Sequence, residues 1–299
     1  AAKSQQRTGS DSYGDKIDTI LQYIDRYYIG SKPEISTEDI LAKGLLSGIG
    51  DKYAQYWTAE EYADYMETES GEYAGIGVSV IWNDDNKCEI YKVNKNSPAQ
   101  EAGLQVRDLI VGVDGKRDFE DLDSVVAVVR GEVGSEVELT IERDGREQTV
   151  FVERRRIQQE CVEYEMLEND IGYIYIEQFI LVTDEQFEEA LDDLTKQGMK
   201  SLILDLRDNP GGDYDTVVAM CDRVLPEGPI ITVEDNSGVE TTEYSDAEHY
   251  LDLPMVCLIN GNSASASEVF VGAIKDYRLA TVIGETSYGK GIVQSIFTL

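Results

Sequence analysis

The strongest constraint on the fold lies in the second half of the chain, where apolar runs of strand length alternate with helical segments. Such runs cover 171–176, 201–206, 255–259 and 279–283, and helical periodicity separates the first two over 184–196. This alternation is typical of a largely parallel sheet, because parallel strands need crossover connections between them. Ligands bind such sheets at the carboxyl ends of the strands, so functional residues are expected where these runs end.

Three of those ends carry loops of glycine and small polar residues. The loops read R-D-N-P-G-G at 207–212, N-G-N-S-A-S at 260–265 and G-E-T-S-Y-G-K-G at 284–291. A helix is expected to follow the second loop, with Ser263 or Ser265 in its first turn. Backbone N–H groups are unpaired at a helix start and the local dipole favours negative charge, so a developing oxyanion would be stabilised there.

The net charge limits the partners of this chain. It contains 26 basic and 59 acidic residues among 299, which gives a formal net charge of −33. Phosphates and anionic membrane surfaces would be repelled, so we expect no nucleic-acid partner. The acidity itself is explained by solubility, and a hydrophobic content of 41% suits a globular protein with a sizeable core.

Metal and membrane functions find little support in the sequence. The cysteines are Cys88, Cys161, Cys221 and Cys257. No pair of them has C-x-x-C spacing and His249 is the only histidine, so we expect no metal and no cofactor. The sequence has no run of 18 apolar residues and no visible signal peptide. Residues 1–12 are polar and expected to be disordered, and the apolar end at 297–299 reads as a fragment boundary.

The first half of the chain divides into two sections. Helical spacing at 17–28, capping signatures at 36–39 and 58–61, and the apolar residues that follow predict a helical section over 1–72. Strands, a short helix and an Asp-Gly turn then predict a β domain over 73–155.

The pattern S-P-A-x-x-A-G-L-x-x-x-D-x-I-x-x-V-D-G at 97–115 resembles the bacterial PDZ domains found in proteases. The resemblance implies that Gly75, Ile76, Gly77 and Val78 form the loop that receives a peptide C-terminus. The chemistry suits this role, because glycines let backbone N–H groups turn towards a carboxylate and the adjoining strand can pair with an extended peptide.

Two other chemistries were weighed for the loops of the second half. Gly284, Gly289 and Lys290 match the start of a phosphate-binding P-loop, but Gly291 stands where Ser or Thr must hold magnesium. The run 261–265 is close to a G-x-S-x-G nucleophile elbow, but its last glycine is replaced and His249 would have to serve as the base. Both patterns are incomplete, and a lone histidine in a polar loop is usually a surface residue.

The third interpretation joins the three loops. D-L-R-D-N-P-G-G at 205–212, S-A-S-A-S-E at 263–268 and G-E-T-S-Y-G-K-G-I-V-Q at 284–294 resemble the C-terminal processing, or tail-specific, peptidases. These are serine proteases with a lysine base and an inserted PDZ domain. The resemblance implies an α/β multidomain fold, with a ClpP/crotonase-like core over 156–299 that lacks its C-terminal end.

The resemblance also assigns roles to residues. It implies Ser265 as the nucleophile, Lys290 as its base and Gln294 as the residue that orients the lysine. The oxyanion hole would be formed by the N–H groups of Gly212 and Ala266. No metal or cofactor is implied.

Flanking residues receive structural roles. We expect Arg207 and Asp208 to brace the glycine loop, and Arg130 to link the PDZ domain to the core.

The same resemblance implies partners and a location. The substrates would be unfolded or tagged proteins with apolar C-termini, cleaved by an extracytoplasmic bacterial enzyme. A homodimer and a membrane tether would belong to the intact protein. The alternative from another class is a peptide-binding adaptor with a PDZ domain and an inactive peptidase core.

Overall fold

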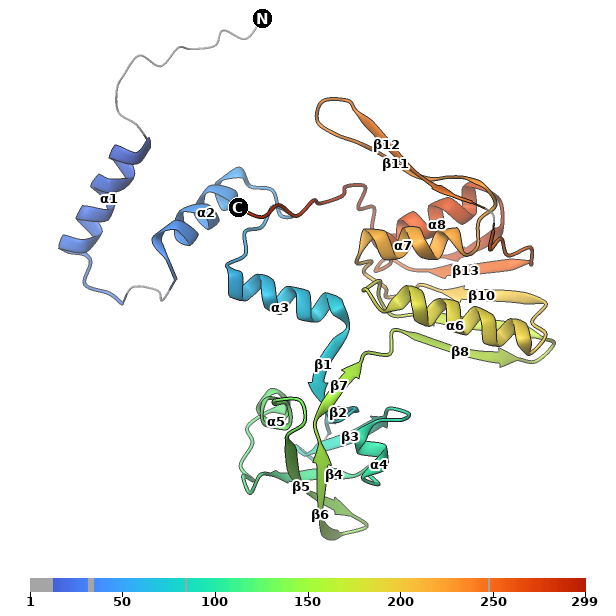
Figure 1. The fold of residues 1–299 in the computed structure, drawn as a ribbon, viewed down its shortest axis with the longest axis horizontal. Helices are drawn as coiled ribbons and strands as arrows, with labels where there is room; N and C mark the ends of the chain where they lie inside the picture. Colours follow the sequence, from blue (N-terminus) through green and yellow to red (C-terminus); the bar gives the residue numbers. More distant parts are fainter. Residues whose placement is uncertain (1–12, 32–34, 84, 247) are drawn as a thin grey trace, which may run out of the picture. The chain divides into compact units, whose positions relative to one another are not determined.

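The computed structural model describes residues 13–31, 35–83, 85–246 and 248–299 (Figure 1). The prediction of disorder for residues 1–12 lies outside these ranges. The chain divides into two compact units, residues 1–58 and 59–299. Within the described ranges, no helix is long and apolar enough to cross a bilayer.

The first unit is helical, as predicted. It contains α1 (Tyr13–Tyr27) and α2 (Thr37–Ile49), and neither helix has a buried residue. The hydroxyl of Ser36 accepts the N–H of Asp39 at 3.0 Å and caps the start of α2. The helix ends at Gly50, whose φ of 76° is the left-handed conformation that favours glycine.

The second unit begins with α3 (Ala59–Ser70), which leads through Gly71 into β1 (Glu72–Gly75). The sequence analysis placed this helix in the N-terminal section, and the boundaries at 72 and 155 remain predictions. The strand β1 pairs in antiparallel register with β7 (Arg155–Gln158), so that Glu72 lies opposite Gln158. The segments that enter and leave the PDZ region therefore form a two-stranded stem.

Between the two stem strands lies a five-stranded antiparallel sheet of order β2-β3-β4-β5-β6. Its strands are β2 (Val78–Trp82), β3 (Cys88–Val93), β4 (Leu109–Val113), β5 (Glu136–Arg143) and β6 (Arg146–Glu153). Two helices, α4 (Pro98–Glu101) and α5 (Leu122–Val129), complete the domain. Fully buried aliphatic residues such as Ile90, Val113 and Leu139 form its core, which is separate from that of the peptidase region.

The peptidase region is built on a sheet of order β14-β13-β10-β9-β8. Its strands are β8 (Val162–Leu167), β9 (Ile171–Ile176), β10 (Ser201–Asp205), β13 (Met255–Ile259) and β14 (Ala280–Gly284). Only β8 is antiparallel to its neighbour. The parallel sheet predicted from the alternation of strands and helices is therefore confirmed.

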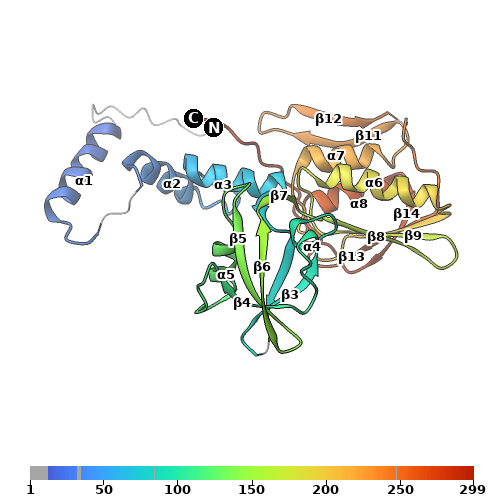
Figure 2. The ribbon, with the colours of Figure 1, turned by 60° about the horizontal axis from the view of Figure 1, so that its bottom comes forward.

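Helices α6 (Thr183–Lys196), α7 (Tyr214–Asp222) and α8 (Ala266–Asp276) pack against this sheet. Figure 2 shows α6 and α7 along the same face of the strands. Phe187 from α6, Met220 from α7 and Phe270 from α8 meet in one buried cluster with residues of β9 and β10. Because the strands are parallel, their carboxyl ends and the loops that follow lie at one edge of the sheet.

Four strands were not predicted, among them the stem strand β1. The region 234–250, expected to be a polar excursion, contains β12 (Glu240–Ser245), which pairs with β11 (Gly228–Glu234). The strand β7 reads R-R-I-Q, and β8 reads V-E-Y-E-M-L at the edge of the sheet. These strands bury few side chains, so they lack the apolar patterns by which strands are found in a sequence.

The aromatic cluster under the helices gives a test of the core. The buried ring of Phe270 meets Phe187 edge-on, with centroids 6.0 Å apart, and lies 6.4 Å from the ring of Phe179. Phe270→Ala should lower the free energy of unfolding by about 3–5 kcal/mol, because a large buried side chain would leave a cavity. The matched control is Phe151→Ala, since Phe151 is 55% exposed on β6. Equal losses in calorimetric unfolding of the two variants would contradict this packing.

Candidate active site

The loop between β13 and α8 forms a strained turn at Ser265. This residue is the N-cap of α8 and adopts φ 54° and ψ −115°. A non-glycine residue in such a conformation costs on the order of 1–3 kcal/mol and persists only where its surroundings hold it. The carbonyl oxygen of Asn209 accepts the N–H of Ala264 at 3.1 Å, and the Glu268 carboxylate accepts the N–H of Ser265 at 2.9 Å.

Of the three neighbouring serines, two are engaged in the structure. The hydroxyl of Ser263 donates to the carbonyl oxygen of Leu206 at 2.7 Å, and that of Ser267 donates to the carbonyl oxygen of Asn209 at 3.0 Å. Both side chains are fully buried. Ser265 is half-buried, and its hydroxyl donates no hydrogen bond within the part of the chain that the structure describes. Among these serines, Ser265 therefore has the available nucleophilic oxygen.

The glycine pair after β10 packs directly against this turn. A Cβ atom on Gly211 would lie 2.7 Å from Cβ of Ser265 and 2.8 Å from the backbone nitrogen of Ala266. Gly212 has φ 142°, and a Cβ there would lie 1.9 Å from the carbonyl oxygen of Phe179. Neither position accepts a larger residue, so the close approach of the two loops depends on both glycines.

Two backbone N–H groups remain available beside Ser265. The N–H of Gly211 donates to Oδ1 of Asn209, and the N–H of Ser265 itself is taken by Glu268. Across the described ranges, the N–H groups of Gly212 and Ala266 find no acceptor. Unengaged backbone donors beside a serine hydroxyl are the kind of group that can bind an oxyanion.

Asn209 joins the glycine pair to the serine turn, and the sequence analysis missed it. Its side chain is fully buried, donates to the carbonyl oxygen of Ile176 at 2.9 Å and accepts the N–H of Gly211 at 2.8 Å. Its carbonyl oxygen accepts from Ala264 and Ser267 on the other loop. An asparagine before Pro-Gly-Gly was available as a signal, because its amide can mimic backbone hydrogen bonding in a turn.

Of the two residues expected to brace the glycine loop, Asp208 ties it to the loop that carries Ser265, whereas Arg207 bonds the end of the preceding strand. Nε of Arg207 donates to Oδ1 of Asp205 at 2.8 Å, within its own strand end. Asp208 accepts from the side-chain amides of Asn262 and Asn260 at 2.8 and 2.9 Å, and these bonds lower the pKa of its carboxyl. The bracing of the glycine pair itself comes from Asn209.

The Glu268 carboxylate connects the serine turn to the loop after β14. Its Oε1 accepts the hydroxyl of Ser287 at 2.7 Å and the N–H of Gly289 at 2.6 Å. Its Oε2 accepts the N–H groups of Ser265 at 2.9 Å and Lys290 at 2.8 Å. The backbone nitrogens of Ser265 and Lys290 are therefore no farther apart than the sum of these two distances. The sequence analysis did not single out Glu268, although the S-x-x-E spacing of a capping box was present.

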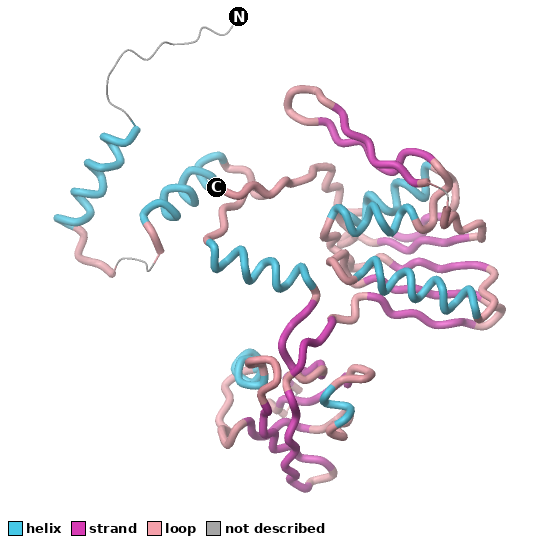
Figure 3. The backbone as a smooth tube through the Cα atoms, viewed as in Figure 1, coloured by secondary structure: helices cyan, strands magenta, loops and turns pink. Residues whose placement is uncertain are grey.

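The remaining member of the expected catalytic set lies outside this cluster. Residues 285–299 form no helix or strand, and Figure 3 draws them as loop. Lys290 is half-buried, whereas Gln294 is exposed and has no hydrogen-bond partner among the described residues. The structure therefore gathers Ser265, Ala266, Gly212 and Lys290, while the role of Gln294 remains a prediction.

The predicted peptide-binding residues line a groove of about 200 Å³ in the PDZ region. The other lining residues are Tyr73, Val80, Ile110, Val125, Val126, Val129 and Arg130. Gly75 ends β1 and Val78 begins β2, which is an edge strand of its sheet and has one side open for pairing. Gly77 is required, because a Cβ at its φ of 80° would lie 2.4 Å from Cβ of Ser97.

Arg130 lies at one end of this groove. Its guanidinium carbon is 5.3 Å from the centre of the Tyr73 ring, on the stem strand β1. This contact joins Arg130 to the stem, and its expected link to the core remains a prediction.

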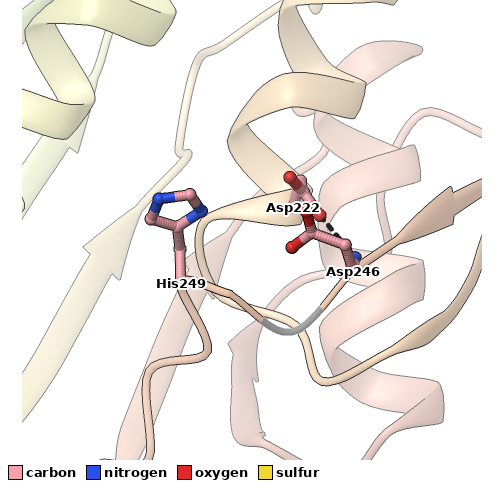
Figure 4. Close-up of side chains that lie close together, drawn as sticks. All are labelled: Asp222, Asp246 and His249. Atoms are coloured by element: carbon pink, nitrogen blue, oxygen red, sulfur yellow. Dashed lines mark hydrogen bonds between the residues drawn. The ribbon is translucent and has the colours of Figure 1, made fainter.

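A further group of metal-ligating side chains was not singled out in the sequence. Asp222 at the end of α7 lies close to Asp246 and His249 (Figure 4), and their ligand atoms are all within 4.8 Å of one another. Asp222 also accepts the N–H of Asp246 at 2.8 Å, which anchors the loop after β12. We therefore assign to Asp222 the role of anchoring this loop.

The network around Asn209 gives a second test. Asn209→Ala should lower the free energy of unfolding by about 1–3 kcal/mol, because the Gly211 N–H and the Ile176 carbonyl would lose their partner inside the protein. The control is Asn262→Ala, which removes an exposed amide bonded to Asp208 and should change stability by less than about 0.5 kcal/mol. A thermal unfolding series in which the two variants behave alike would argue against this network.

Comparison with known proteins is consistent with this arrangement. Residues 170–299 match the model of peptidase family S41, and residues 89–143 match that of the PDZ domain. A probable CtpA-like serine protease of Staphylococcus epidermidis is 35% identical over 286 residues, which are 94% of this chain and 58% of that protein. The counterpart in Staphylococcus saprophyticus is 34% identical over 286 residues. The chain thus spans little more than half the length of these relatives.

Solved structures show the same fold. A putative S41 protease from Bacteroides fragilis has a TM-score of 0.55 at 18% identity, covering 99% of this chain and 83% of that one. The photosystem II D1 C-terminal processing protease has a TM-score of 0.50 at 23% identity, covering 94% and 79%.

Proposed function

Because this chain belongs to the serine peptidases of family S41 and carries a PDZ domain, we propose that it is an endopeptidase with Ser265 as nucleophile and Lys290 as base. One observation carries the proposal: the hydroxyl of Ser265 is unengaged and lies beside two unengaged backbone N–H groups. The neighbouring hydroxyls of Ser263 and Ser267 are buried and already donate to carbonyl oxygens.

The proposed reaction is acyl transfer to serine followed by hydrolysis. Neutral Lys290 takes the proton of Ser265 as its Oγ attacks the peptide carbonyl carbon. The negative oxygen of the tetrahedral intermediate is held by the N–H groups of Gly212 and Ala266. The lysine ammonium then protonates the leaving amine, and the carbon–nitrogen bond breaks. Water, deprotonated by the same lysine, hydrolyses the acyl-enzyme and restores Ser265.

The strained turn has a function in this scheme. A serine inside a regular helix can donate its hydroxyl to a carbonyl oxygen one turn earlier, and Ser267 in α8 donates to the carbonyl oxygen of Asn209 on the other loop. A φ of 54° places Ser265 outside the helical backbone conformation, so its side chain does not point as a helical side chain would. Its backbone N–H donates to the Glu268 carboxylate. The oxyanion must then be bound by the next amide, that of Ala266, and by Gly212 across the loop. Gln294 is proposed to orient the lysine side chain by hydrogen bonding.

We further propose that substrates are proteins with an unfolded, apolar C-terminus. The groove beside β2 supports this class, because it is lined mainly by valine and isoleucine and adjoins an open strand edge. A peptide that adds to this edge would gain main-chain hydrogen bonds and place its last side chain among apolar residues. An extracytoplasmic location, a homodimer and a membrane tether are proposals for the intact protein.

The catalytic assignment is tested by cleavage of an unfolded peptide with an apolar C-terminus. We expect the parent chain to cleave, and Ser265→Ala and Lys290→Ala each to lower kcat by at least about a thousandfold. The double variant should be no slower than either single variant, because the two groups act as a unit. Lys275→Ala, an exposed lysine near the end of α8, is the control and should keep the parental rate.

Three outcomes of this assay would change the assignment. Cleavage by Ser265→Ala would move the nucleophile to another residue. Cleavage by Lys290→Ala at the parental rate would remove the lysine from the mechanism. A parent that binds the peptide without cutting it would support the alternative function, a peptide-binding adaptor.

Peptide capture is tested separately in the groove. Val126→Glu should weaken binding of the same peptide at least tenfold, measured by calorimetry, because a carboxylate would enter an apolar site that also receives the peptide carboxylate. The control is Val133→Glu, since Val133 is 52% exposed and outside the groove lining. Equal affinities of the two variants would place the peptide elsewhere on the protein.

A further inference from the structure

We infer that Glu268 is a positioning residue whose carboxylate sets the nucleophile and the base in fixed register by bonding the backbones of both. This inference rests on the proposed function of Ser265 and Lys290. It assigns to Glu268 no contact with the substrate and no proton transfer. Its role is to fix the backbone positions from which the side chains of Ser265 and Lys290 extend.

The contacts of Glu268 come from two segments that are distant in sequence. The N–H of Ser265 and the N–H of Lys290 bond the same oxygen, Oε2, at 2.9 and 2.8 Å. The hydroxyl of Ser287 and the N–H of Gly289 bond the other oxygen, Oε1, at 2.7 and 2.6 Å. One planar group thus fixes the start of α8 against the lysine loop.

The lysine loop is irregular and is held to the rest of the peptidase region by a small set of backbone bonds besides those to Glu268. Residues 285–299 form no regular structure, and the strand before them ends at Gly284. Two backbone bonds help: the N–H of Glu285 donates to Ile259, and the N–H of Tyr288 donates to Ser263. The contacts nearest to Lys290 along the chain are those with Glu268. Without them, the lysine loop would lose its attachment closest to the base.

All four partners of this carboxylate are hydrogen-bond donors. An ionised carboxylate accepts at both oxygens, and such bonds are stronger than those between neutral groups. An amide of the same shape has one accepting oxygen and would direct its NH₂ group at two donors. Although partial burial works to raise the pKa of Glu268, the bonds from Ser287, Gly289 and Lys290 hold it below its usual value. The carboxylate is therefore charged at neutral pH.

The test compares Glu268→Gln with Glu285→Gln, an exposed glutamate on the same loop whose side chain forms no hydrogen bond within the described ranges. Amide hydrogen exchange over residues 286–291 should be at least tenfold faster in Glu268→Gln and unchanged in Glu285→Gln. In the peptide-cleavage assay, kcat of Glu268→Gln should fall at least a hundredfold. KM should stay within about twofold, because the peptide is captured in a separate groove.

A second variant separates a loss of positioning in Glu268→Gln from a loss of folding in that variant. Ser287→Ala removes one of the four donors and leaves the charge in place, so we expect a fall in kcat of about tenfold with parental thermal stability. Parental exchange rates in Glu268→Gln would overturn the inference. So would a kcat for Glu268→Gln equal to that of Glu285→Gln.

Failure of this inference can be told apart from failure of the proposed function. The exchange measurement needs no catalysis, so it decides whether Glu268 holds the loop even if the parent does not cleave peptides. A cleaving parent with a fully active Glu268→Gln would overturn the positioning role alone. A non-cleaving parent with the expected exchange pattern would overturn the catalytic assignment while the holding of the loop stands.

Discussion

The site depends on holding one residue in a backbone conformation that it would not otherwise adopt. Ser265 has φ 54°, and the surrounding hydrogen bonds offset the strain. Asn209 supports the turn from the sheet side, through its carbonyl oxygen, and Glu268 supports it from the first turn of α8 and ties it to the lysine loop. Both are polar groups with every contact satisfied, and in a protein interior such networks define one arrangement of their members. The positions of the glycine pair and of Lys290 follow from these two residues.

The sequence predicted the architecture of the peptidase region well, because buried parallel strands have recognisable apolar runs. The strands 171–176, 201–206 and 255–259 are confirmed almost to the residue. The strands β7, β8 and β12 were missed for the complementary reason, since most of their side chains are exposed or only partly buried. The period of apolar residues in a sequence reflects which side chains are buried. A strand that buries few side chains therefore shows no clear period.

The loops at the strand ends were found by their composition, but the two residues that hold them were not. Asn209 and Glu268 act through hydrogen bonds between segments more than 15 residues apart, and a local pattern cannot show which partners will meet. The family resemblance selected Ser265, but for the same reason local sequence gives no physical ground for choosing it over Ser263 and Ser267. The choice rests on which hydroxyl is left unengaged, and this is known only once the tertiary contacts are formed.

The stem of the PDZ domain has a mechanical consequence. Gly71, between α3 and β1, packs against the side chains of Ile180 and Val182, and the Gln159 N–H donates to its carbonyl oxygen at 2.7 Å. One residue before Ile180, Phe179 bonds the backbones of Gly211 and Asp213, on both sides of Gly212. A short, contiguous path of packed backbone therefore runs from the base of the peptide-binding domain to a proposed oxyanion donor. The orientation of the stem and the position of the Gly212 amide are therefore constrained by the same set of contacts.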